Sequence, residues 1–319
     1  MKIVQKYGGS SLADNDCLLR VAKRILNDSG DNKLLIVVSA QGKTTDGLTE
    51  KYREISDDFP SAASDALLCT GEQISAALLT AALKKLGGAA VCLNGMQVPI
   101  IAVGNHGDGK IRRIYTGRIR KEWRRGNIVV ITGFQGVNDR GDCMTLGRGG
   151  SDTSAVALAA ALRADKCMIF TDVDGVYSAD PRKIPNAKRF ESIHVDTMIQ
   201  LAECGAKVLH PSAAELAKRY CVSTEILTSF SDKEGTSVSS NAPKRTGVTM
   251  KAEEDGTGTV TAVLAEDLLP STVLALHAVS ERYGTRMTTE DGRIVFPIHS
   301  EAAKELLQEI HDILYPDNG

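Results

Sequence analysis

Short apolar runs alternate along this chain with stretches of helical periodicity, and this alternation constrains the fold more than any other feature. The strand-like runs are IVQKY from residue 3, LLIVVSA from 34, AAVCLNG from 89, NIVVITGF from 127, CMIFTDV from 167 and STEILTSF from 223. Helical spacing is found for Leu19, Ala22, Ile25 and Leu26; Ile74, Ala77, Leu78 and Ala81; Val156, Leu158 and Leu162; and Met198, Leu201 and Ala202. Strands that alternate with helices predict an α/β fold with a mostly parallel central sheet covered by helices on both faces.

The composition changes between Ser231 and Thr259, where the sequence is SDKEGTSVSSNAPKRTGVTMKAEEDGTGT. This stretch is polar, rich in glycine and charge, and lacks an apolar period, so residues 239–258 are expected to form a linker. Residues 1–238 are then expected to form one large domain. Residues 259–319 contain the strand-like TVTAVLAED and RIVFPI and the helical PSTVLALHAVSERYG and EAAKELLQEIHDIL, which predicts a small α+β unit.

The charge balance gives no reason to expect nucleic acid or an anionic membrane as a partner, because 38 Lys and Arg residues stand against 40 Asp and Glu residues. The seven cysteines are scattered and never spaced as Cys-x-x-Cys, which is typical of reduced thiols in the cytosol. The N-terminal segment lacks the apolar core of a signal peptide, and no apolar run reaches the roughly 18 residues of a membrane span. We therefore expect a soluble cytoplasmic protein without membrane association.

The first strand-like run ends in KYGGSS, which places Lys6 close to Gly8, Gly9 and Ser10. Glycines at the carboxyl end of a strand let backbone N–H groups approach a phosphate closely, and a lysine beside them supplies a compact positive charge. An ordinary strand-to-helix turn with an exposed lysine has the same composition. On these residues alone both interpretations stay open.

Two further segments carry candidate contacts for a polar substrate. The segment SAQGKTT, which begins at Ser39 and ends at Thr45, follows an apolar run and would line the crevice at the strand ends of an open sheet, or simply cap a helix. The segment TGE precedes an apolar helical pattern, and a glutamate at Glu72 in a first helical turn usually interacts with the helix dipole. Its functional alternative is a contact to a substrate ammonium group.

The most specific segment is LGRGGSD, from residue 146 to 152. Its three glycines permit backbone conformations closed to other residues, and Ser151 or Asp152 can cap the following helix, whose N-terminus favours an anion. Arg148 can bind a carboxylate with two parallel hydrogen bonds, which a lysine cannot reproduce. A capped structural loop accounts for the Ser-Asp step but not for the arginine among the glycines.

A polar loop, TDVDGVYSADPR, follows the run at 167 and contains Asp172, Tyr177 and Arg182, which suit the ribose, base and phosphates of a nucleotide. A solvated turn would explain only its polarity. Lys207 adds another cation beside a glycine at a predicted helix boundary. The aspartates of the loop do not form an EF-hand calcium motif, and the six histidines show no metal-ligand spacing, so no metal ligand is predicted.

Taken together, these segments resemble the aspartate kinases of the amino acid kinase family. The matching segments are KYGGSS at 6, VVSAQGKTTDGL at 37, TGEQISAALL at 70, GFQGVNDRGDCMTLGRGGSDTSA at 133, FTDVDGVYSADPR at 170 and ECGAKVLHPSAAE at 203. They cover residues 2–238 in the family's order, and the blocks from GFQG to LGRGGSD and from TDVDGVY to DPR are highly specific. The resemblance implies the amino acid kinase fold and the use of ATP with Mg²⁺.

By resemblance, the reaction is transfer of the γ-phosphoryl group of ATP to the β-carboxylate of L-aspartate, which gives 4-phospho-L-aspartate for the synthesis of lysine, threonine and methionine. A carboxylate with a pKa of about 4 is already an anionic nucleophile, so catalysis should depend on positioning and charge neutralisation. The resemblance assigns Lys6 to the transferring phosphoryl group and Asp152 to the orientation of that lysine. It assigns Gly8, Gly9 and Ser10 to the phosphate path, Arg148 to the substrate α-carboxylate, Glu72 to its ammonium, Ser39 and Thr45 to the pocket, and Thr171, Asp172, Tyr177, Arg182 and Lys207 to ATP.

The sequence departs from the family pattern in two places. Cys143 and Met144 replace the hydroxyl residues usual before the glycine loop. Family members normally carry two regulatory ACT units, whereas residues 259–319 resemble only the second, which puts feedback inhibition by lysine or threonine in doubt. The resemblance also implies a homodimer. Two alternatives stay open: a family relative with another acceptor, such as acetylglutamate or a nucleoside monophosphate, and a catalytically weak regulator that senses aspartate or a nucleotide.

Overall fold

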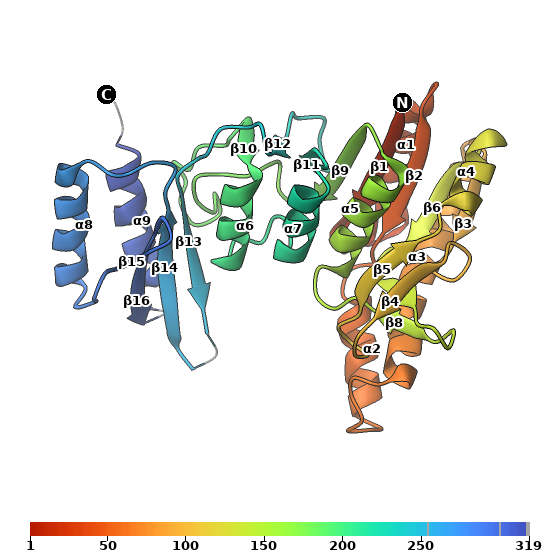
Figure 1. Ribbon diagram of the computed structural model, residues 1–319, viewed down its shortest axis with the longest axis horizontal. Helices are drawn as coiled ribbons and strands as arrows, with labels where there is room; N and C mark the ends of the chain where they lie inside the picture. Colours follow the sequence, from red (N-terminus) through yellow and green to blue (C-terminus); the bar gives the residue numbers. More distant parts are fainter. Residues whose placement is uncertain (254, 300, 317–319) are drawn as a thin grey trace. The chain divides into compact units, whose positions relative to one another are not determined.

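The computed structural model describes residues 1–253, 255–299 and 301–316, and the chain divides into two compact units (Figure 1). The first unit consists of residues 1–174 and 216–233. The second consists of residues 175–215 and the described part of 234–319. Each unit has its own sheet and helices and is described by itself.

A parallel sheet lies at the centre of the first unit, with the strand order β11-β9-β1-β2-β6-β3 and every neighbouring pair parallel. Its strands are β1 (Lys2–Tyr7), β2 (Lys33–Val38), β3 (Ala90–Leu93), β6 (Ile128–Thr132), β9 (Lys166–Thr171) and β11 (Thr224–Thr228). The six strand-like runs of the sequence form these six strands, so this prediction is confirmed. Parallel order follows because the connecting segments contain helices that return the chain to the same edge of the sheet.

Helices cover both faces of this sheet. They are α1 (Asn15–Ser29), α2 (Thr44–Arg53), α3 (Ala62–Lys85), α4 (Gly117–Arg124) and α5 (Gly150–Leu162), with a short 3-10 helix at Gly9–Leu12. On one face, α1 and α3 pack on a core that includes Leu34, Ile36 and Val130. Leu35 and Val37 point to the other face and are also fully buried, where α5 contacts β1, β2 and β9. The predicted α/β class with a covered, mostly parallel sheet is therefore confirmed.

A second, smaller sheet in the first unit has the strand order β5-β4-β7-β8 and mixes parallel and antiparallel pairs. Its strands are β4 (Ile100–Val103), β5 (Lys110–Ile114), β7 (Gln135–Val137) and β8 (Cys143–Thr145). These strands were not predicted, because each is only three to five residues long and their apolar runs are too short for a clear period.

Helix α3 begins well before the position expected from the sequence. Ser61 and Ser64 form a capping box at its start, so Glu72 lies in the middle of the helix and not in its first turn. The expected position of Glu72 in a first helical turn was wrong, because Thr70 and Gly71 have the composition of a helix start. Within the described residues, α3 is also the one helix long and apolar enough to cross a membrane, but more than half of its apolar window is buried inside the first unit. Its apolar composition is explained by that burial.

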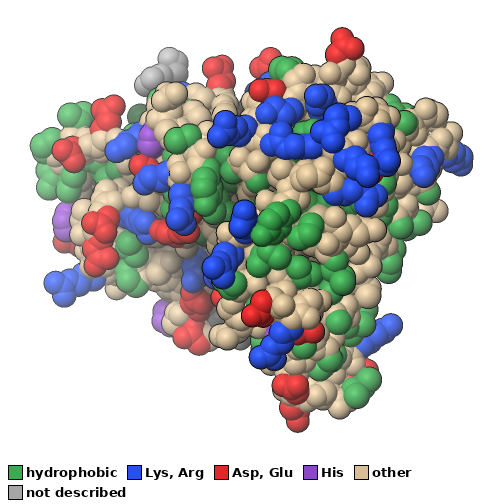
Figure 2. All heavy atoms as spheres, turned by 45° about the vertical axis from the view of Figure 1, so that its right-hand side comes forward, with side chains coloured by type: hydrophobic (Ala, Val, Ile, Leu, Met, Phe, Trp, Pro, Cys, Tyr) green, Lys and Arg blue, Asp and Glu red, His purple; other side chains and the backbone are tan. Residues whose placement is uncertain are grey.

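Charged side chains are unevenly distributed although the formal net charge is only −2. Figure 2 shows Lys and Arg side chains gathered in the upper part of the face that it draws. In the sequence, basic residues are dense from β5 to the end of α4, where the buried Glu122 accepts hydrogen bonds from Arg118 and Arg125 at 2.8 and 3.3 Å. The predicted absence of a nucleic-acid partner remains a prediction.

The second unit combines two layers of secondary structure. Its elements are β10 (Ser192–His194), β12 (Thr236–Ser239), β13 (Gly247–Ala252), β14 (Thr257–Val263), β15 (Thr288–Glu290) and β16 (Arg293–His299), with α6 (Val195–Glu203), α8 (Pro270–Arg282) and α9 (Ala303–Leu314); α7 (Pro211–Arg219) runs from the second unit into the first. Strands β10 and β12 are parallel, whereas β13, β14, β16 and β15 form an antiparallel sheet. Helices α8 and α9 pack on each other, and α9 also contacts the sheet.

The strands and helices expected after residue 259 are present, and the antiparallel sheet with its helices fits an ACT-like α+β unit. The stretch expected to be a linker, 239–258, is only partly irregular because Gly247–Ala252 forms β13. Val248 is fully buried with Val260 and Phe296. The neighbouring glycines and charges hide this buried strand in the sequence. The division into residues 1–238, 239–258 and 259–319 remains a prediction.

Candidate active site

The loops that follow β1, β2, β6 and β9 meet at the carboxyl edge of the parallel sheet. The backbone N–H of Ser39 donates to the carbonyl of Tyr7 at 3.1 Å, and that of Gly8 donates to Phe170 at 3.3 Å. The N–H of Gly133 donates to Val38 at 2.9 Å. In an open α/β sheet this edge is where ligands bind. Four segments that the sequence analysis singled out therefore converge on one edge.

Lys6 and Asp152 form an ion pair at this edge. The Nζ of Lys6, on β1, lies 2.6 Å from Oδ1 of Asp152, and only 11% and 13% of the two side chains are exposed. Asp152 lies in the first turn of α5, where the helix dipole favours a carboxylate. The carboxylate therefore holds the ammonium group in one position at the carboxyl end of β1, so the structure brings these two predicted site residues together.

The glycines after β1 are needed for close approach. A Cβ atom at Gly9 would lie 2.7 Å from the carbonyl oxygen of Ala40, so only glycine lets the loops after β1 and β2 touch. A Cβ at Gly8 would lie 3.5 Å from Nζ of Lys6, so the absence of a side chain leaves the backbone beside the ammonium bare. Ser10 follows on the exposed side of the 3-10 helix. A bare backbone beside a fixed cation fits a phosphate chain.

Glu72 presents a buried carboxylate that is only half satisfied. Its residue is 3% exposed, and Oε1 accepts a hydrogen bond from the N–H of Ala40 at 2.9 Å. The other oxygen, Oε2, is buried and has no hydrogen-bond partner among the described residues. Burial raises the pKa of Glu72 to about 7. A cation bound at Oε2 would supply the missing partner and favour the charged form.

Gly71 brings Glu72 to this position, and its importance was missed in the sequence. A Cβ at Gly71 would lie 2.8 Å from the Cβ of Ala40, so a side chain there would push α3 away from the loop after β2. Glycine inside a helix is destabilising by roughly 0.5–1 kcal/mol relative to alanine, and at Gly71 this cost accompanies a close contact between the helix and a loop. This contact was missed because the segment was expected to start a helix.

We expect Gly71→Ala to raise the KM for the substrate that binds Glu72 by about tenfold and to lower the free energy of unfolding by about 1–3 kcal/mol, because overpacking displaces α3 from Ala40. Gly47→Ala is the matched control: Gly47 lies inside α2, and a Cβ there has open space. The control should be stabilised by about 0.5–1 kcal/mol with unchanged kinetics. Urea unfolding and steady-state kinetics measure both; equal behaviour of the two variants would contradict the close-packing argument.

Arg148 lies in a loop that the glycines hold in a left-handed conformation. The φ angles of Gly147 and Gly149 are 71° and 68°, and Arg148 between them is exposed and has no ion-pair partner among the described residues. Phe134, whose φ of 66° is unusual for a residue other than glycine, packs against this loop. A Cβ at Gly150 would lie 2.8 Å from its ring. The backbone of Arg148 is therefore fixed, and its guanidinium group is available to bind an anion.

Ser39 and Thr45 are both half-buried at the same edge. Ser39 follows β2 directly, and Thr45 lies in the first turn of α2. The turn between them is joined to the loop after β1 by the N–H of Gly42, which donates to the carbonyl of Gly9 at 3.1 Å. Both hydroxyl groups therefore belong to the loop cluster around Glu72.

The residues expected to bind a nucleotide are divided between the two units. Thr171, at the end of β9, donates from Oγ1 to Asp172 Oδ1 at 3.0 Å in the first unit. The other three, Tyr177, Arg182 and Lys207, belong to the second unit. There, Nε and Nη2 of Arg182 donate to the two carboxylate oxygens of Asp180 at 3.0 and 3.2 Å. Lys207 is exposed between α6 and α7.

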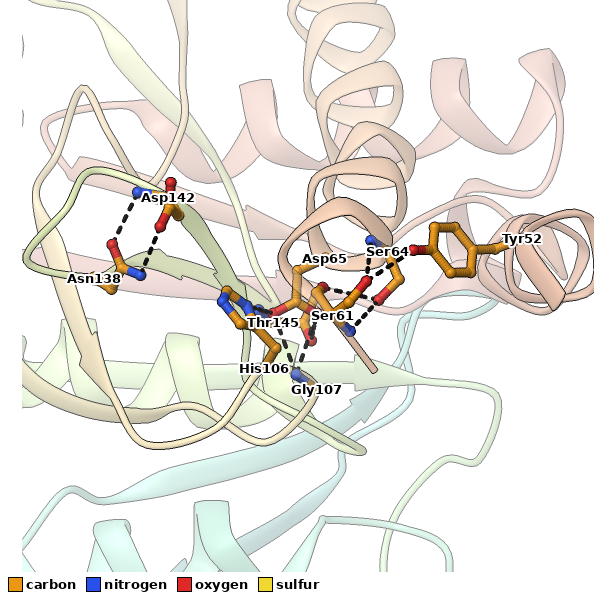
Figure 3. A network of polar contacts seen from close by, with 9 residues as sticks. All are labelled: Tyr52, Ser61, Ser64, Asp65, His106, Gly107, Asn138, Asp142 and Thr145. Atoms are coloured by element: carbon orange, nitrogen blue, oxygen red, sulfur yellow. Dashed lines mark hydrogen bonds and ion pairs between the residues drawn. The ribbon is translucent and has the colours of Figure 1, made fainter. Parts of the chain in front are cut away.

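No group of three or more potential metal ligands occurs among the His, Cys, Asp and Glu side chains that the structure describes. Several of the histidines have structural contacts, for example His311 and His106. His311 is fully buried and shares a hydrogen bond with Ser178 Oγ at 2.9 Å, and His106 Nδ1 lies 2.8 Å from Asp65 Oδ2 (Figure 3).

Comparison with known proteins places these features in a family. Residues 1–228 match the model of the amino acid kinase family. The chain is 48% identical over 238 residues to an aspartokinase of Mycolicibacterium smegmatis, which covers 74% of this chain and 56% of that relative. It is 41% identical over 316 residues to an aspartokinase of Geobacillus stearothermophilus, covering 96% of this chain and 78% of the relative. The crystal structure of aspartate kinase from Synechocystis superposes with a TM-score of 0.69 at 36% identity, covering 96% of this chain and 54% of that one.

Proposed function

The chain belongs to the amino acid kinase family, and we propose that it is an aspartate kinase, which transfers the γ-phosphoryl group of ATP to the β-carboxylate of L-aspartate. The proposal agrees with the aspartokinases to which the chain is similar. Since the chain spans 56% of the length of the first of these relatives, the activity is proposed for the chain as it stands and has to be tested on it.

The observation that carries the proposal is the unpaired, buried oxygen of Glu72 at the same sheet edge as the Lys6–Asp152 pair. An ammonium group satisfies both the charge and the free hydrogen-bond acceptor of a buried carboxylate. An acetylated amine lacks that charge. The site therefore supports an acceptor with a free α-amino group over acetylglutamate or a nucleoside monophosphate.

Each of the predicted site residues has a separate role in this proposal. Arg148 binds the α-carboxylate of aspartate, Glu72 binds its ammonium group, and Ser39 and Thr45 contact the rest of the substrate. Lys6, held by Asp152, neutralises charge on the phosphoryl group during transfer, and the β-carboxylate attacks without a general base since it is already ionised. Catalysis then depends on positioning of two anions by fixed cations.

ATP supplies the phosphoryl group, and Mg²⁺ bound to its phosphates lowers their charge. The bare backbone at Gly8, Gly9 and Ser10 fits the phosphate path. For the nucleotide we propose contacts from Thr171, Asp172, Tyr177, Arg182 and Lys207. Arg182 would then exchange its contact with Asp180 for a phosphate oxygen. A homodimer and a cytoplasmic location are part of the same proposal.

Release of ADP from ATP and Mg²⁺ with a panel of acceptors tests the proposal, and a hydroxamate assay identifies the acyl phosphate product. L-aspartate should be the preferred acceptor, and N-acetyl-L-aspartate should be turned over at least about a hundredfold less efficiently because it leaves Glu72 without a cation. Turnover of acetylglutamate or a nucleoside monophosphate alone would overturn the proposal in favour of another kinase. No turnover with any acceptor would favour a regulatory protein.

The raised pKa of Glu72 predicts a pH-dependent KM for aspartate. Glu72 is mostly ionised above about pH 7, so it binds the substrate ammonium more strongly as the pH rises. The KM for aspartate at pH 6 should therefore be about tenfold higher than at pH 8. The ionised groups of aspartate itself do not titrate in this window. KM is measured at saturating MgATP. Glu72→Gln should raise KM at pH 8 and remove its pH dependence; a flat profile for the unmodified protein would contradict this role.

A further inference from the structure

Two cysteines face each other where α3 packs on β8. Cys69 lies on α3 and Cys143 on β8. One turn before Cys69, Asp65 accepts hydrogen bonds from the N–H and Oγ1 of Thr145 at 3.0 and 2.6 Å (Figure 3). These two bonds fix the helix against the strand beside the cysteines.

The spacing along both elements places the sulfur atoms together. From Asp65 to Cys69 the helix advances about 6 Å and returns to the same face. From Thr145 back to Cys143 the strand advances about 6.8 Å and also returns to the same face. Since the two advances nearly match, Cys69 is the next contact after Asp65 and meets Cys143. The two thiols accordingly lie close enough for each to shift the pKa of the other.

The two thiols differ in exposure and acidity. Cys143 is partly exposed, whereas Cys69 is fully buried. The hydrogen bond from Cys69 lowers the pKa of Cys143 to about 7, against burial and against the nearby carboxylates of Asp65 and Asp142. The same bond, together with burial, raises the pKa of Cys69 well above its usual range. The partly exposed Cys143 is therefore the nucleophile, and the buried Cys69 is the resolving cysteine.

We propose that Cys69 and Cys143 form a reversible oxidation site that reacts with hydrogen peroxide to give an intramolecular disulfide. The Cys143 thiolate attacks one peroxide oxygen, which breaks the O–O bond and gives a sulfenic acid and hydroxide. The Cys69 sulfur then attacks the sulfenic sulfur, which forms the S–S bond and releases water. Two thiols lose two electrons in total, and one peroxide is reduced to two waters. A dithiol reductant reverses the step.

The disulfide would act on the site through α3 and β8. An S–S bond holds the two sulfurs about 2.05 Å apart and so links α3 covalently to β8. Glu72 lies three residues after Cys69 on α3, and the loop of Arg148 follows β8. Oxidation is therefore expected to weaken aspartate binding. This consequence rests on the proposed function, whereas formation of the disulfide does not.

The first test is chemical and independent of activity. The full chain is treated with a small excess of hydrogen peroxide and digested without reduction, and the peptides are analysed by mass spectrometry. We expect one linked peptide pair joining Cys69 to Cys143, a mass loss of about 2 Da from two hydrogens, and full reversal by dithiothreitol. Cys221→Ser, which removes an exposed cysteine elsewhere, should leave this result unchanged. Oxidation of Cys143 to sulfinic acid without the linked pair would overturn the proposal.

The second test measures the hydrogen bond between the thiols. The rate of alkylation of Cys143 by iodoacetamide should reach half its maximum near pH 7 in the unmodified protein. In Cys69→Ala the midpoint should rise toward the usual thiol pKa of about 8.5. An unchanged midpoint would show that the sulfurs do not interact. If peroxide raises the KM for aspartate in the unmodified protein, Cys143→Ser should abolish that sensitivity; a disulfide without a change in KM would refute only the effect on the site.

Discussion

Lys6→Met is expected to lower kcat for phosphoryl transfer by about a thousandfold or more, with a small change in the KM for aspartate. The ammonium of Lys6 is almost buried and lies 2.6 Å from Asp152, so its position is fixed before the reaction begins. A fixed charge in a site of low dielectric constant stabilises the transition state most, and removal of a single preorganised donor lowers kcat by about 10²–10³ in other enzymes. Loss of a full positive charge should lower kcat by an amount at or above the upper end of this range.

The control variant is Lys2→Met, on the same strand. Lys2 lies at the opposite end of β1 and donates from Nζ to the carbonyl of Leu162 at 2.9 Å, so it should leave kcat unchanged. Lys6→Met also leaves Asp152 without its partner, which lowers the free energy of unfolding by about 3–5 kcal/mol. The double variant with Asp152→Asn should recover much of that stability and none of the activity. Single-turnover kinetics and thermal unfolding separate the two effects; near-normal kcat in folded Lys6→Met would remove Lys6 from the reaction.

Arg148→Ala is expected to lower kcat/KM for aspartate by about a hundredfold through KM, without a change in stability. The side chain is exposed and has no ion-pair partner among the described residues, so its removal should change the free energy of unfolding by less than about 0.5 kcal/mol. Hydrogen bonds to charged groups contribute about 1.5–3 kcal/mol, and a bidentate pair with a carboxylate falls at the upper end. Arg148→Lys should retain the charge but not the paired hydrogen bonds, and we expect a loss of about tenfold.

Arg140→Ala provides the matched comparison, because Arg140 is an exposed arginine in the loop between β7 and β8. Its removal should leave all kinetic constants unchanged. Aspartate saturation curves at saturating MgATP give KM for each variant, and circular dichroism verifies the fold. If Arg148→Ala and Arg140→Ala behave alike, or if Arg148→Ala changes the KM for ATP and not that for aspartate, the carboxylate contact is wrong.

The sequence by itself determined the main sheet of the first unit, because its strands are short runs rich in apolar residues, and β1, β2 and β6 are buried along almost their whole length. It also singled out Lys6 at the end of a strand, Gly9 and Arg148 in glycine-rich turns, and Asp152 at the start of a helix, since glycine and charge interrupt the apolar pattern there. Such local signals survive without knowledge of the neighbours. The short strands of the second sheet and β13 escaped prediction because their few apolar residues repeat too briefly to show a period.

Only the tertiary structure decided which of these loops meet and what each side chain faces. Glu72 has the sequence context of a helix start, yet it becomes a buried carboxylate in the middle of α3 because Gly71 lets the helix touch Ala40. Cys69 and Cys143 are unrelated in sequence, and the hydrogen bonds of Asp65 to Thr145 bring them together. Contacts of this kind depend on packing distances between segments far apart in the chain, and a sequence read in order carries no such distances.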